Sequence, residues 1–335
     1  MGSEGITIGI NGFGRIGRYV CRLCLDSPDI HLAAVNDLFD IETLAHLLKY
    51  DSVHGRLKWN FHIEGQELVF EHGKRIRFYK FATPQDIPWG ECNVNKVLEC
   101  TGRFLTTELA SGHLGNSVYR VILSAPPKDF ETPTVVMGVN EHILKAGNRI
   151  ISNASCTTNN AAPMLRVLQG ICDIESAYIT TVHSYTSDQR LHDSPHSDLR
   201  RARAAAQSII PTTTGAAKAL TRVFPELEDK IGGCGVRVPV PNGSFTDITM
   251  VVRNPPPVAD INAAMFNASL HELQGILGYT EDPIVSIDII GTSVSCMFDA
   301  QLTSVVNNLV KVVGWYDNES GYSNRLLDLV RYWNL

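Results

Sequence analysis

The sequence lacks the long apolar run, of about 18 or more residues, that a transmembrane helix needs. Its first residues, Met-Gly-Ser-Glu-Gly, also lack the basic segment and the apolar stretch of a secretory signal. The composition, with 44% hydrophobic and 19% charged residues, is that of a soluble globular chain. We therefore expect a cytoplasmic protein.

A strong excess of basic charge is absent as well. The net charge is −6, and the one basic cluster, Arg-Arg-Ala-Arg at 200–203, is short. Such a cluster suits local salt bridges, subunit contacts or a phosphate contact, whereas nucleic-acid-binding proteins usually carry a basic face. Neither nucleic acid nor a membrane is expected as a primary partner.

Clustered cysteines are missing too. The eight cysteines are spread from Cys21 to Cys296, unlike the dense cysteines of small secreted disulfide scaffolds. Cys21 and Cys24 form a C-x-x-C pair, but they share one face of a predicted helix, and no second pair of ligands follows. We expect reduced thiols, a packing role for this pair, and no metal site.

Repeats are also absent, and the length of 335 residues exceeds one compact core, which predicts two domains. The first part combines short buried runs, typical of parallel strands, with an alternating stretch at 59–79 that suggests an antiparallel insertion. The parallel strands are predicted at 6–10, 31–35, 97–100, 121–124 and 149–152, with a helix to about residue 24. The second part favours a mostly antiparallel α+β domain, with strands predicted at 177–182, 235–240, 245–253, 284–289, 293–298 and 309–316, and helices at 162–170, 215–223 and 258–275; a terminal helix is predicted at 322–333.

A glycine-rich turn follows the first predicted strand. The run Gly12, Phe13, Gly14, Arg15, Ile16 and Gly17 has the pattern G-x-G-x-x-G and opens a helix. Gly12 allows the tight turn, Gly14 the close approach of a pyrophosphate, and Gly17 the packing of the helix on the strand. This context predicts a Rossmann-type dinucleotide-binding domain in preference to a purely structural turn.

Asp37 stands 20 positions after Gly17, at the end of the second predicted strand. A carboxylate at this place can accept hydrogen bonds from the ribose hydroxyls of NAD and would repel the 2′-phosphate of NADP. NAD is therefore the expected cofactor. A helix-capping or strand-end role for Asp37 is compatible with this prediction.

Cys156 lies in the run Ser-Asn-Ala-Ser-Cys-Thr-Thr-Asn, and His183 follows 27 residues later in Thr-Val-His-Ser-Tyr-Thr. A cysteine can act as a covalent nucleophile when a nearby imidazole and local dipoles lower its thiol pKa from about 8.5. Most free cysteines are instead buried, inert thiols. A reactive thiol beside a nicotinamide would fit aldehyde oxidation through a thioester.

Long motifs in order along the chain resemble the phosphorylating glyceraldehyde-3-phosphate dehydrogenase family. They are Asn-Gly-Phe-Gly-Arg-Ile-Gly, Leu-Lys-Tyr-Asp-Ser-Val-His-Gly-Arg, Ser-Asn-Ala-Ser-Cys-Thr-Thr-Asn and Trp-Tyr-Asp-Asn-Glu-Ser-Gly-Tyr-Ser-Asn. The resemblance runs nearly end to end. It implies an NAD-binding Rossmann domain at 1–155 with 320–335, and a catalytic domain at 156–319 that includes the 184–203 loop.

The resemblance also implies a mechanism and a set of site residues. Cys156 would attack the aldehyde of D-glyceraldehyde 3-phosphate while His183 takes the thiol proton and stabilises the oxyanion; hydride transfer to NAD would leave a thioester, which inorganic phosphate resolves to 1,3-bisphosphoglycerate. The substrate phosphate would bind at Thr186 and Arg237 with Asp188 near, inorganic phosphate at Ser155, Thr157, Thr214 and Gly215, and Arg201 would be a further contact. The cofactor would also contact Thr101, Ser124, Asn318 and Tyr322.

Family features further imply a homotetramer to which the 184–203 loop contributes, and Ser194-Pro195 in this loop resembles NAD-preferring members. The chain departs from the family pattern in the run Asn-Gly-Ser-Phe at 242–245, where Asn-Val-Ser-Val is usual, and at three single positions. Asn160 replaces a second cysteine, Ala82 replaces an arginine on the cofactor side, and Arg103 stands where a small apolar residue or phenylalanine is common.

Other functions remain open at this level. Erythrose-4-phosphate dehydrogenase, a close relative, shares the cysteine motif, but the run Thr-Thr-Thr-Gly-Ala-Ala-Lys at 212–218 favours a retained phosphate site. A non-catalytic NAD-binding or RNA-binding module on the same fold is a second alternative. A Cys-His hydrolase is a third, and it leaves the glycine motif unexplained.

Overall fold

The computed structural model describes residues 5–333, which divide into two compact units. The first unit contains the chain up to Val135, His142–Ala154 and the chain from Ser323; the second contains Val136–Glu141 and Ser155–Tyr322. The sequence placed the boundaries at 155/156 and 319/320, within three residues of these, but it did not separate the short segment 136–141.

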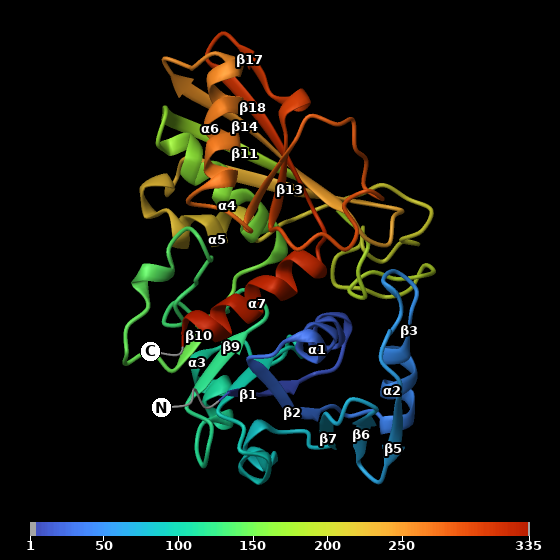
Figure 1. Cartoon of the computed structure of the whole chain (residues 1–335). Coiled ribbons are helices and arrows are strands. Elements are labelled where there is room, and N and C mark those ends of the chain that lie inside the picture. The colour runs from blue at the N-terminus through green and yellow to red at the C-terminus, as the bar shows by residue number, and fades with distance from the viewer. Residues whose placement is uncertain (1–4, 334–335) are drawn as a thin grey trace. The chain divides into compact units, whose positions relative to one another are not determined.

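The first unit is built on a mostly parallel sheet in the order β10-β9-β8-β1-β2-β7-β6-β5 (Figure 1). Strands β10, β9, β8, β1, β2 and β7 pair in parallel, and β5, β6 and β7 form the predicted antiparallel insertion. The strands are β1 Ile6–Asn11, β2 Ile30–Asn36, β5 Phe61–Glu64, β6 Glu67–Phe70, β7 Arg75–Tyr79, β8 Lys96–Glu99, β9 Arg120–Leu123 and β10 Ile150–Ser152, and a separate hairpin joins β3 Tyr50–Asp51 to β4 Gly55–Arg56. The helices are α1 Arg15–Asp26, α2 Ile41–Lys49, α3 Thr107–Ala110 and most of α7 Ser320–Tyr332.

The central strands of this sheet are buried on both faces, which explains why they read as continuous apolar runs. Ile8 and Ile10 of β1, Val35 of β2 and Val97 of β8 are all fully inaccessible to solvent. Helix α1 packs against β2 through its buried side, which includes Cys21 and Cys24. The pair therefore packs in the core, as the spacing predicted.

The second unit has a mostly antiparallel sheet in the order β12-β13-β11-β14-β18-β16-β15, with β17 paired to β18. Its strands are β11 Asp173–Ser184, β12 Ile210–Thr212, β13 Ile231–Val238, β14 Ser244–Arg253, β15 Leu277–Thr280, β16 Cys296–Asp299, β17 Ser304–Val306 and β18 Leu309–Tyr316. Its helices, α4 Cys156–Gln169, α5 Ala216–Val223 and α6 Val258–Leu270, contact this sheet (Figure 1). The α/β Rossmann-type and α+β classes predicted from the sequence are thus confirmed.

One predicted strand, at 284–289, is wrong. Its alternating apolar residues are not paired in a sheet, and Val285 and Ile287 are exposed. Asp288 explains the difference, because its carboxylate accepts a hydrogen bond from the Val285 amide at 2.8 Å while its own amide donates to the Val285 carbonyl at 3.0 Å. These local bonds close a turn in place of a ladder. The sequence also missed β15, and it predicted α6 five residues too long.

Gly17 is the position in the glycine-rich turn that is least tolerant of an added side chain. A Cβ added there would lie 2.2 Å from the carbonyl oxygen of Gly12, which is backbone and cannot rotate away. We expect Gly17→Ala to lower the free energy of unfolding by about 3 kcal/mol, the cost of overpacking a tight contact. Urea unfolding of the variant would measure this loss.

Gly14 offers a matched control for Gly17→Ala, because a Cβ added at Gly14 meets nothing within 4 Å. Its φ of −71° is open to any residue. Gly14→Ala should therefore leave the unfolding curve within about 0.5 kcal/mol of the wild type. Equal losses for both alanines would contradict the packing argument.

Candidate active site

The glycine-rich turn links β1 to α1 and is held by backbone and carboxylate bonds. Gly12 has φ of +94°, which glycine adopts without strain, and its amide donates to the Asn36 carbonyl at 2.8 Å. The Phe13 amide donates to Oδ2 of Asp37 at 2.7 Å. Asp37 therefore braces the turn and, as a carboxylate with several lone pairs, keeps acceptor capacity for ribose hydroxyls. The open space beside Gly14 suits a pyrophosphate.

The other residues of the turn have different surroundings. The Phe13 side chain is buried and packs edge-on against Phe78, with ring centroids 5.4 Å apart. Arg15 forms an ion pair with Asp51, with 2.7 Å between Nη1 and Oδ2. Ile16 is half-buried at the start of α1. Of this group, the backbone of Phe13 and the glycines are thus better placed than the Phe13 ring to meet a ligand.

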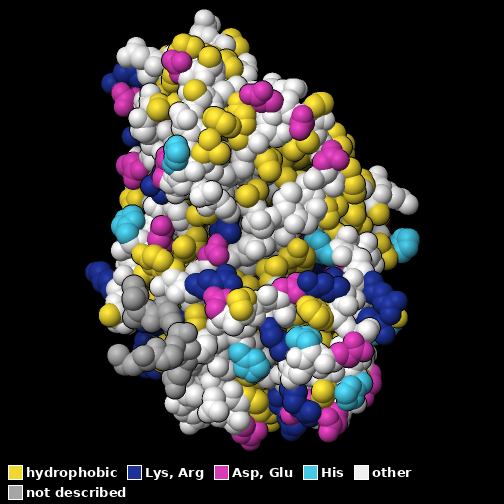
Figure 2. All heavy atoms as spheres, in the orientation of Figure 1, with side chains coloured by type: hydrophobic (Ala, Val, Ile, Leu, Met, Phe, Trp, Pro, Cys, Tyr) yellow, Lys and Arg dark blue, Asp and Glu magenta, His cyan; other side chains and the backbone are white. Residues whose placement is uncertain are grey.

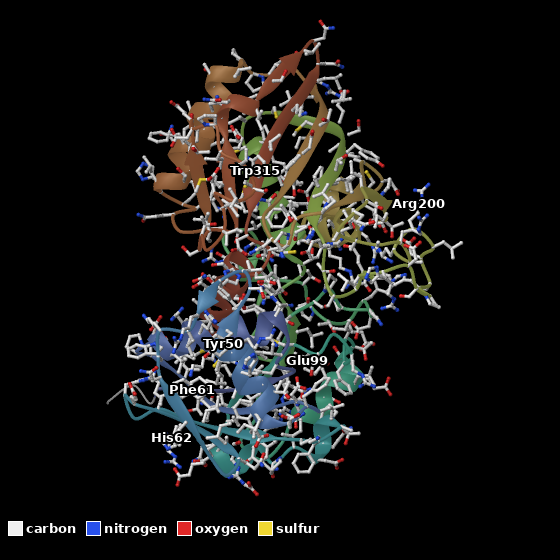
Figure 3. The ribbon with its side chains drawn as sticks, turned by 90° about the vertical axis from the view of Figure 1, so that its right-hand side faces the viewer. Tyr50, Phe61, His62, Glu99, Arg200 and Trp315 are labelled. Atoms are coloured by element: carbon white, nitrogen blue, oxygen red, sulfur yellow. The ribbon has the colours of Figure 1, made fainter. Side chains whose placement is uncertain are left out.

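A buried polar network lies beneath this turn, and the sequence analysis missed it. Glu99, labelled in Figure 3 at the end of β8, accepts hydrogen bonds from Asn11 Nδ2 at 2.6 Å and from the Thr101 amide at 2.8 Å. His113 Nε2 lies 3.0 Å from Glu99 Oε2, and His113 Nδ1 accepts a bond from the Trp89 indole at 3.1 Å. The sequence did contain a signal for this network, because Glu99 places a carboxylate in the otherwise apolar predicted strand at 97–100, where a buried charge needs hydrogen-bond partners.

Thr101 and Ser124 lie at the ends of neighbouring parallel strands, as predicted. The Ser124 amide donates to the Glu99 carbonyl at 2.9 Å, and Thr101 is bonded to the Glu99 carboxylate. Both residues therefore sit at the carboxyl edge of the sheet, where doubly wound folds bind their ligands.

Cys156 is the first residue of α4 in the second unit. Ser155 caps this helix, because its hydroxyl accepts a bond from the Thr158 amide at 3.1 Å. The preceding Ala154 has φ of +54°, in the left-handed region that costs a non-glycine residue about 1 kcal/mol. The half-buried thiol thus lies at the positive end of the helix dipole, which favours a thiolate.

His183 lies on β11 and faces the thiol. Its Nε2 is 3.5 Å from Cys156 Sγ, and its Nδ1 is 2.7 Å from the Ser184 carbonyl oxygen. A tautomer with its proton on Nδ1 would donate to this carbonyl and leave Nε2 free to accept the thiol proton. The Arg237 guanidinium, which can only donate, lies 2.6 Å from Nδ1 and favours the other tautomer, so a base at Nε2 requires Arg237 to give up its contact with Nδ1. The structure therefore brings together the two predicted catalytic residues.

Arg237 is placed beside His183 by strand register, since β11 and β13 pair in parallel with His183 opposite Arg237. Nη1 of Arg237 lies 2.6 Å from His183 Nδ1 and donates to the Ser184 carbonyl at 2.9 Å. Burial and then the charge of Arg237 lower the pKa of His183 to about 3. Burial raises the pKa of the Cys156 thiol, and the Arg237 charge opposes this rise.

These directions differ from the expectation of a lowered thiol pKa. Burial disfavours both charged forms, the Cys156 thiolate and the His183 imidazolium, and so raises the thiol pKa and lowers the imidazole pKa. A thiol with a raised pKa would need a base to take its proton, and His183 Nε2 lies 3.5 Å from Sγ. This arrangement suits general-base activation during the reaction.

The lowered pKa of His183 predicts an acid-dependent loss of stability. The folded chain binds a proton here only near pH 3, whereas an unfolded chain binds one near pH 6.5. The contribution of neutral His183 to the free energy of unfolding is therefore fully present above about pH 6.5 and is lost as the pH falls towards 3. Between about pH 7 and pH 4.5, wild-type protein should lose about 2 kcal/mol more unfolding free energy than His183→Asn. Urea unfolding across this range is the measurement, and parallel pH curves for the two proteins would contradict it.

Tyr316 joins the two elements that carry Cys156 and His183, and the sequence analysis did not single it out. Its buried hydroxyl lies 2.9 Å from the hydroxyls of Thr157 on α4 and of Thr181 on β11. Its ring meets His183 edge-on at 5.9 Å. Thr157, predicted to contact phosphate, is thus bonded to Tyr316 in this structure. The motif Trp-Tyr-Asp-Asn contained the residue, but only its asparagine was assigned a role.

Arg201 connects the 184–203 loop to the threonine run. It forms an ion pair with Asp188 and donates to Thr212 Oγ1 at 2.9 Å and to the Thr213 carbonyl at 3.2 Å. The bonds from Arg201 outweigh the effect of burial and keep the pKa of Asp188 below its usual value. The Arg201 guanidinium therefore links Asp188 of the loop to Thr212 and Thr213, which precede the predicted phosphate-binding residue Thr214.

The remaining predicted anion residues lie at turns. Thr214 Oγ1 accepts a bond from the Ala216 amide at 3.2 Å, and Gly215 is the N-cap of α5. The Thr186 carbonyl accepts a bond from the Gln189 amide at 3.0 Å. The start of α5 thus presents a hydroxyl and backbone amides of the kind that bind phosphate.

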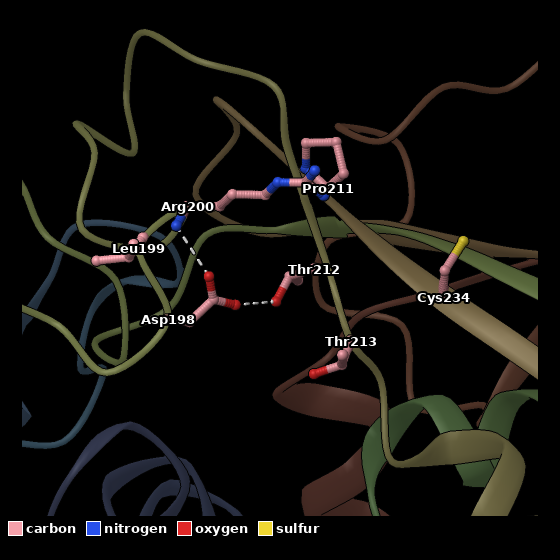
Figure 4. A pocket seen from close by; sticks show the side chains of 7 residues that line it. All are labelled: Asp198, Leu199, Arg200, Pro211, Thr212, Thr213 and Cys234. Carbon is pink, nitrogen blue, oxygen red and sulfur yellow. Dashed lines mark hydrogen bonds between the residues drawn. The ribbon is translucent and has the colours of Figure 1, made fainter.

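A pocket of about 500 Å³ opens beside the threonine run (Figure 4). It is lined by Asp198, Leu199, Arg200, Pro211, Thr212, Thr213 and Cys234. Asp198 accepts bonds there from Thr212 Oγ1 at 2.7 Å and from the Arg200 amide at 2.9 Å. Neither Cys156 nor His183 lines this pocket.

Asn318 and Tyr322 belong to the second unit, whereas the other predicted cofactor residues belong to the first. The turn at Asn318 is held by Asp317, whose Oδ1 accepts bonds from the Glu319 amide at 2.8 Å and the Ser320 amide at 2.9 Å. Tyr322 is buried in the first turn of α7.

Three further features of the described residues bear on the class of site. Within 5–333, no cluster of histidine, cysteine, aspartate or glutamate side chains could hold a metal ion. No helix in that range is long and apolar enough to cross a membrane. On the face seen in Figure 2, basic and acidic side chains are intermixed.

Comparison with known proteins gives matches to both parts of the chain. Residues 6–107 match the family model described as glyceraldehyde 3-phosphate dehydrogenase, NAD binding domain. Residues 155–318 match the model described as glyceraldehyde 3-phosphate dehydrogenase, C-terminal domain.

Whole proteins match over nearly their full length. A glyceraldehyde-3-phosphate dehydrogenase from Geobacillus stearothermophilus is 52% identical over 98% of both chains. Glyceraldehyde-3-phosphate dehydrogenase 2 from Streptomyces avermitilis is 51% identical over 97% of both chains, and glyceraldehyde-3-phosphate dehydrogenase 1 from Bacillus subtilis is 49% identical over 98% of both.

Proposed function

Because this chain belongs to the glyceraldehyde-3-phosphate dehydrogenase family and is therefore an NAD-dependent oxidoreductase, we propose that it oxidises D-glyceraldehyde 3-phosphate to 1,3-bisphosphoglycerate in glycolysis or gluconeogenesis. The observation that carries the proposal is the distance of 3.5 Å between Cys156 Sγ and His183 Nε2 at the start of α4. Inorganic phosphate is the proposed second substrate.

The residues of the first unit fit NAD. The space beside Gly14 would admit the pyrophosphate, the start of α1 would favour its charge, and Asp37 would accept bonds from the ribose. Asn318 and Tyr322 of the second unit would hold the nicotinamide end. NAD, when bound, supplies the acceptor for a hydride.

In the proposed first half of the reaction, Cys156 Sγ forms a bond to the aldehyde carbon while its proton passes to His183 Nε2. The protonated imidazole then donates to the oxygen of the hemithioacetal. When the hydride leaves this carbon, the hydroxyl proton returns to the imidazole, and a thioester remains on Cys156.

In the second half, a phosphate oxygen attacks the thioester carbon and the Cys156 thiolate leaves. Thr214 and the amides at the start of α5 would orient inorganic phosphate, with Ser155 and Thr157 at the start of α4. Thr186 and Arg237, with Asp188 near, would place the phosphate of the substrate, and Arg201, which pairs with Asp188, would contact a phosphate from the 184–203 loop.

The test is NADH formation by purified protein from D-glyceraldehyde 3-phosphate and NAD, with and without inorganic phosphate. Sustained turnover that requires phosphate is expected, because the thioester otherwise accumulates. Preference for erythrose 4-phosphate without phosphate would instead favour the relative that uses water. No turnover with either aldehyde would favour a non-catalytic NAD-binding or RNA-binding role.

Asp37 gives a prediction on cofactor choice. Asp37→Asn removes the charge that repels a 2′-phosphate and keeps the size of the side chain, so the ratio of kcat/KM for NADP to that for NAD should rise about tenfold. Initial rates with both cofactors measure this ratio. Asp40→Asn, which removes the N-cap carboxylate of α2 three residues later, is the control and should leave the ratio unchanged. If Asp37→Asn and the wild type had the same ratio of kcat/KM for NADP to that for NAD, Asp37 would not determine the choice of cofactor.

A second copy of the chain is the proposed partner, in a homotetramer. Helices α4, α5 and α6 cover one side of the second sheet, while alternate residues of β14, such as Phe245 and Val251, remain half-exposed on the other. Leu191 and Leu199 of the 184–203 loop are 75% and 82% exposed. Burial of such apolar surface between copies would stabilise an oligomer, and light scattering of the purified protein tests its size.

A further inference from the structure

Two buried serines converge on the side-chain amide of Asn318. Ser184 Oγ donates a hydrogen bond to Asn318 Oδ1 at 3.0 Å, and Ser244 Oγ donates to the same oxygen at 3.4 Å. Ser244 Oγ also accepts a bond from the Ser184 amide at 3.0 Å, which directs its own proton towards Asn318. All three residues are at least nine-tenths buried.

The three residues meet because their strands are neighbours. Ser184 ends β11, Ser244 begins β14, and Asn318 follows β18 by two residues; β14 lies between β11 and β18 in the sheet. Ser244 pairs with Tyr316 in the register of β14 and β18. The backbone on either side of Asn318 is held by Asp317, which accepts bonds from Asn242 as well as from the following turn. The amide therefore projects from a rigid position.

The two serine hydroxyls determine which end of the Asn318 amide faces outward. A carbonyl oxygen has two lone pairs, and here both have a hydroxyl donor. The amino nitrogen Nδ2 donates to no other described residue in 5–333. The exposed end of the amide is thus a hydrogen-bond donor, and an acceptor is the group that would complement it.

We propose that Ser184 and Ser244 are positioning residues that hold Nδ2 of Asn318 towards the carbonyl oxygen of the nicotinamide carboxamide. The inference rests on the proposed function, which assigns Asn318 to the nicotinamide end of NAD. A rotated Asn318 amide would direct its own oxygen at the carboxamide oxygen, and two acceptors repel each other. The serines therefore favour one orientation of the carboxamide.

Binding measurements separate this role from a general effect on folding. Isothermal titration would give Kd values for NAD, for thionicotinamide adenine dinucleotide, whose sulfur is a weak acceptor, and for ADP-ribose, which lacks the nicotinamide. The variants are Ser184→Ala, Ser244→Ala, the double variant and Asn318→Ala. Ser295→Ala is the matched control, because Ser295 is a buried serine of the same unit outside this network.

The wild type should bind NAD more tightly than the thio analogue. In the double serine variant this preference should fall by about tenfold, towards the value in Asn318→Ala, while the Kd of ADP-ribose stays within about twofold of wild type. Ser295→Ala should retain the full preference.

Three outcomes would overturn the proposal, and they do not all have the same meaning. If Asn318→Ala loses the preference for NAD over the thio analogue but the serine variants keep it, the positioning role fails and the proposed function stands. The same conclusion follows if the serine variants weaken the binding of ADP-ribose as much as that of NAD. If Asn318→Ala binds all three ligands like the wild type, the assignment of Asn318 to the nicotinamide fails as well.

Discussion

Replacement of Cys156 by serine should lower kcat for aldehyde oxidation by about 10⁴-fold or more, the largest effect expected from one substitution. A serine hydroxyl has a much higher pKa than a thiol, so His183 cannot activate it as readily, and an ester would replace the thioester. The change is small in volume, and Ser155 would still cap α4. Steady-state and single-turnover rates of NADH formation measure the loss.

Cys172 provides the matched control for this substitution. It is a half-buried cysteine just beyond the other end of α4, and its Sγ donates to the Leu168 carbonyl at 3.2 Å. Cys172→Ser can keep this bond, so its kcat should stay within about twofold of wild type. If Cys156→Ser were as active as the wild type, Cys156 would not be the nucleophile. If Cys156→Ser and Cys172→Ser lost similar amounts of activity, the cause would be damage to α4.

Substitution of His183 by asparagine should lower kcat by about 10²- to 10⁴-fold, the usual contribution of a general acid or base. The thiol would then need to lose its proton to water, and burial raises its pKa. The activity of His183→Asn should consequently rise with pH over the alkaline range, as the thiolate forms without the imidazole. A pH profile of kcat/KM measures this dependence.

The pair Cys156 and His183 should also behave as one unit. The double variant should be little slower than Cys156→Ser alone, because the base has no function without the nucleophile. His271→Asn, at an exposed position after α6, should retain wild-type activity. Losses that multiply in the double variant would indicate that His183 acts independently of the thiol.

Local patterns predicted much of the fold. The Rossmann-type sheet followed from buried apolar runs, and the glycine turn from a motif whose spacing has a steric cause, since a Cβ at Gly17 would meet the Gly12 carbonyl oxygen. The incorrect strand at 284–289 shows the limit of periodicity. Its alternation is as regular as that of a strand, but the Asp288 carboxylate satisfies the Val285 amide locally.

The chemistry-bearing residue types were evident from the sequence by itself. Cys156 and His183 stand in distinctive motifs, and Asp37 follows the glycine motif at the spacing that its proposed role requires. Such features are local, because a helix cap, a glycine turn and a strand end each depend on residues close together in the chain. The family was likewise evident from motifs, and the comparisons confirmed it together with its cofactor, NAD.

Only the tertiary structure decided how these residues act on one another. Strand register placed Arg237 beside His183, and the packing of α4 on β11 and β18 placed Tyr316 between Thr157 and Thr181. The directions of the pKa shifts depend on burial and on charges that lie far apart in sequence, so the spacing of motifs could not supply them. The orientation of the Asn318 amide has the same origin, because its two hydroxyl donors come from two other strands of the sheet.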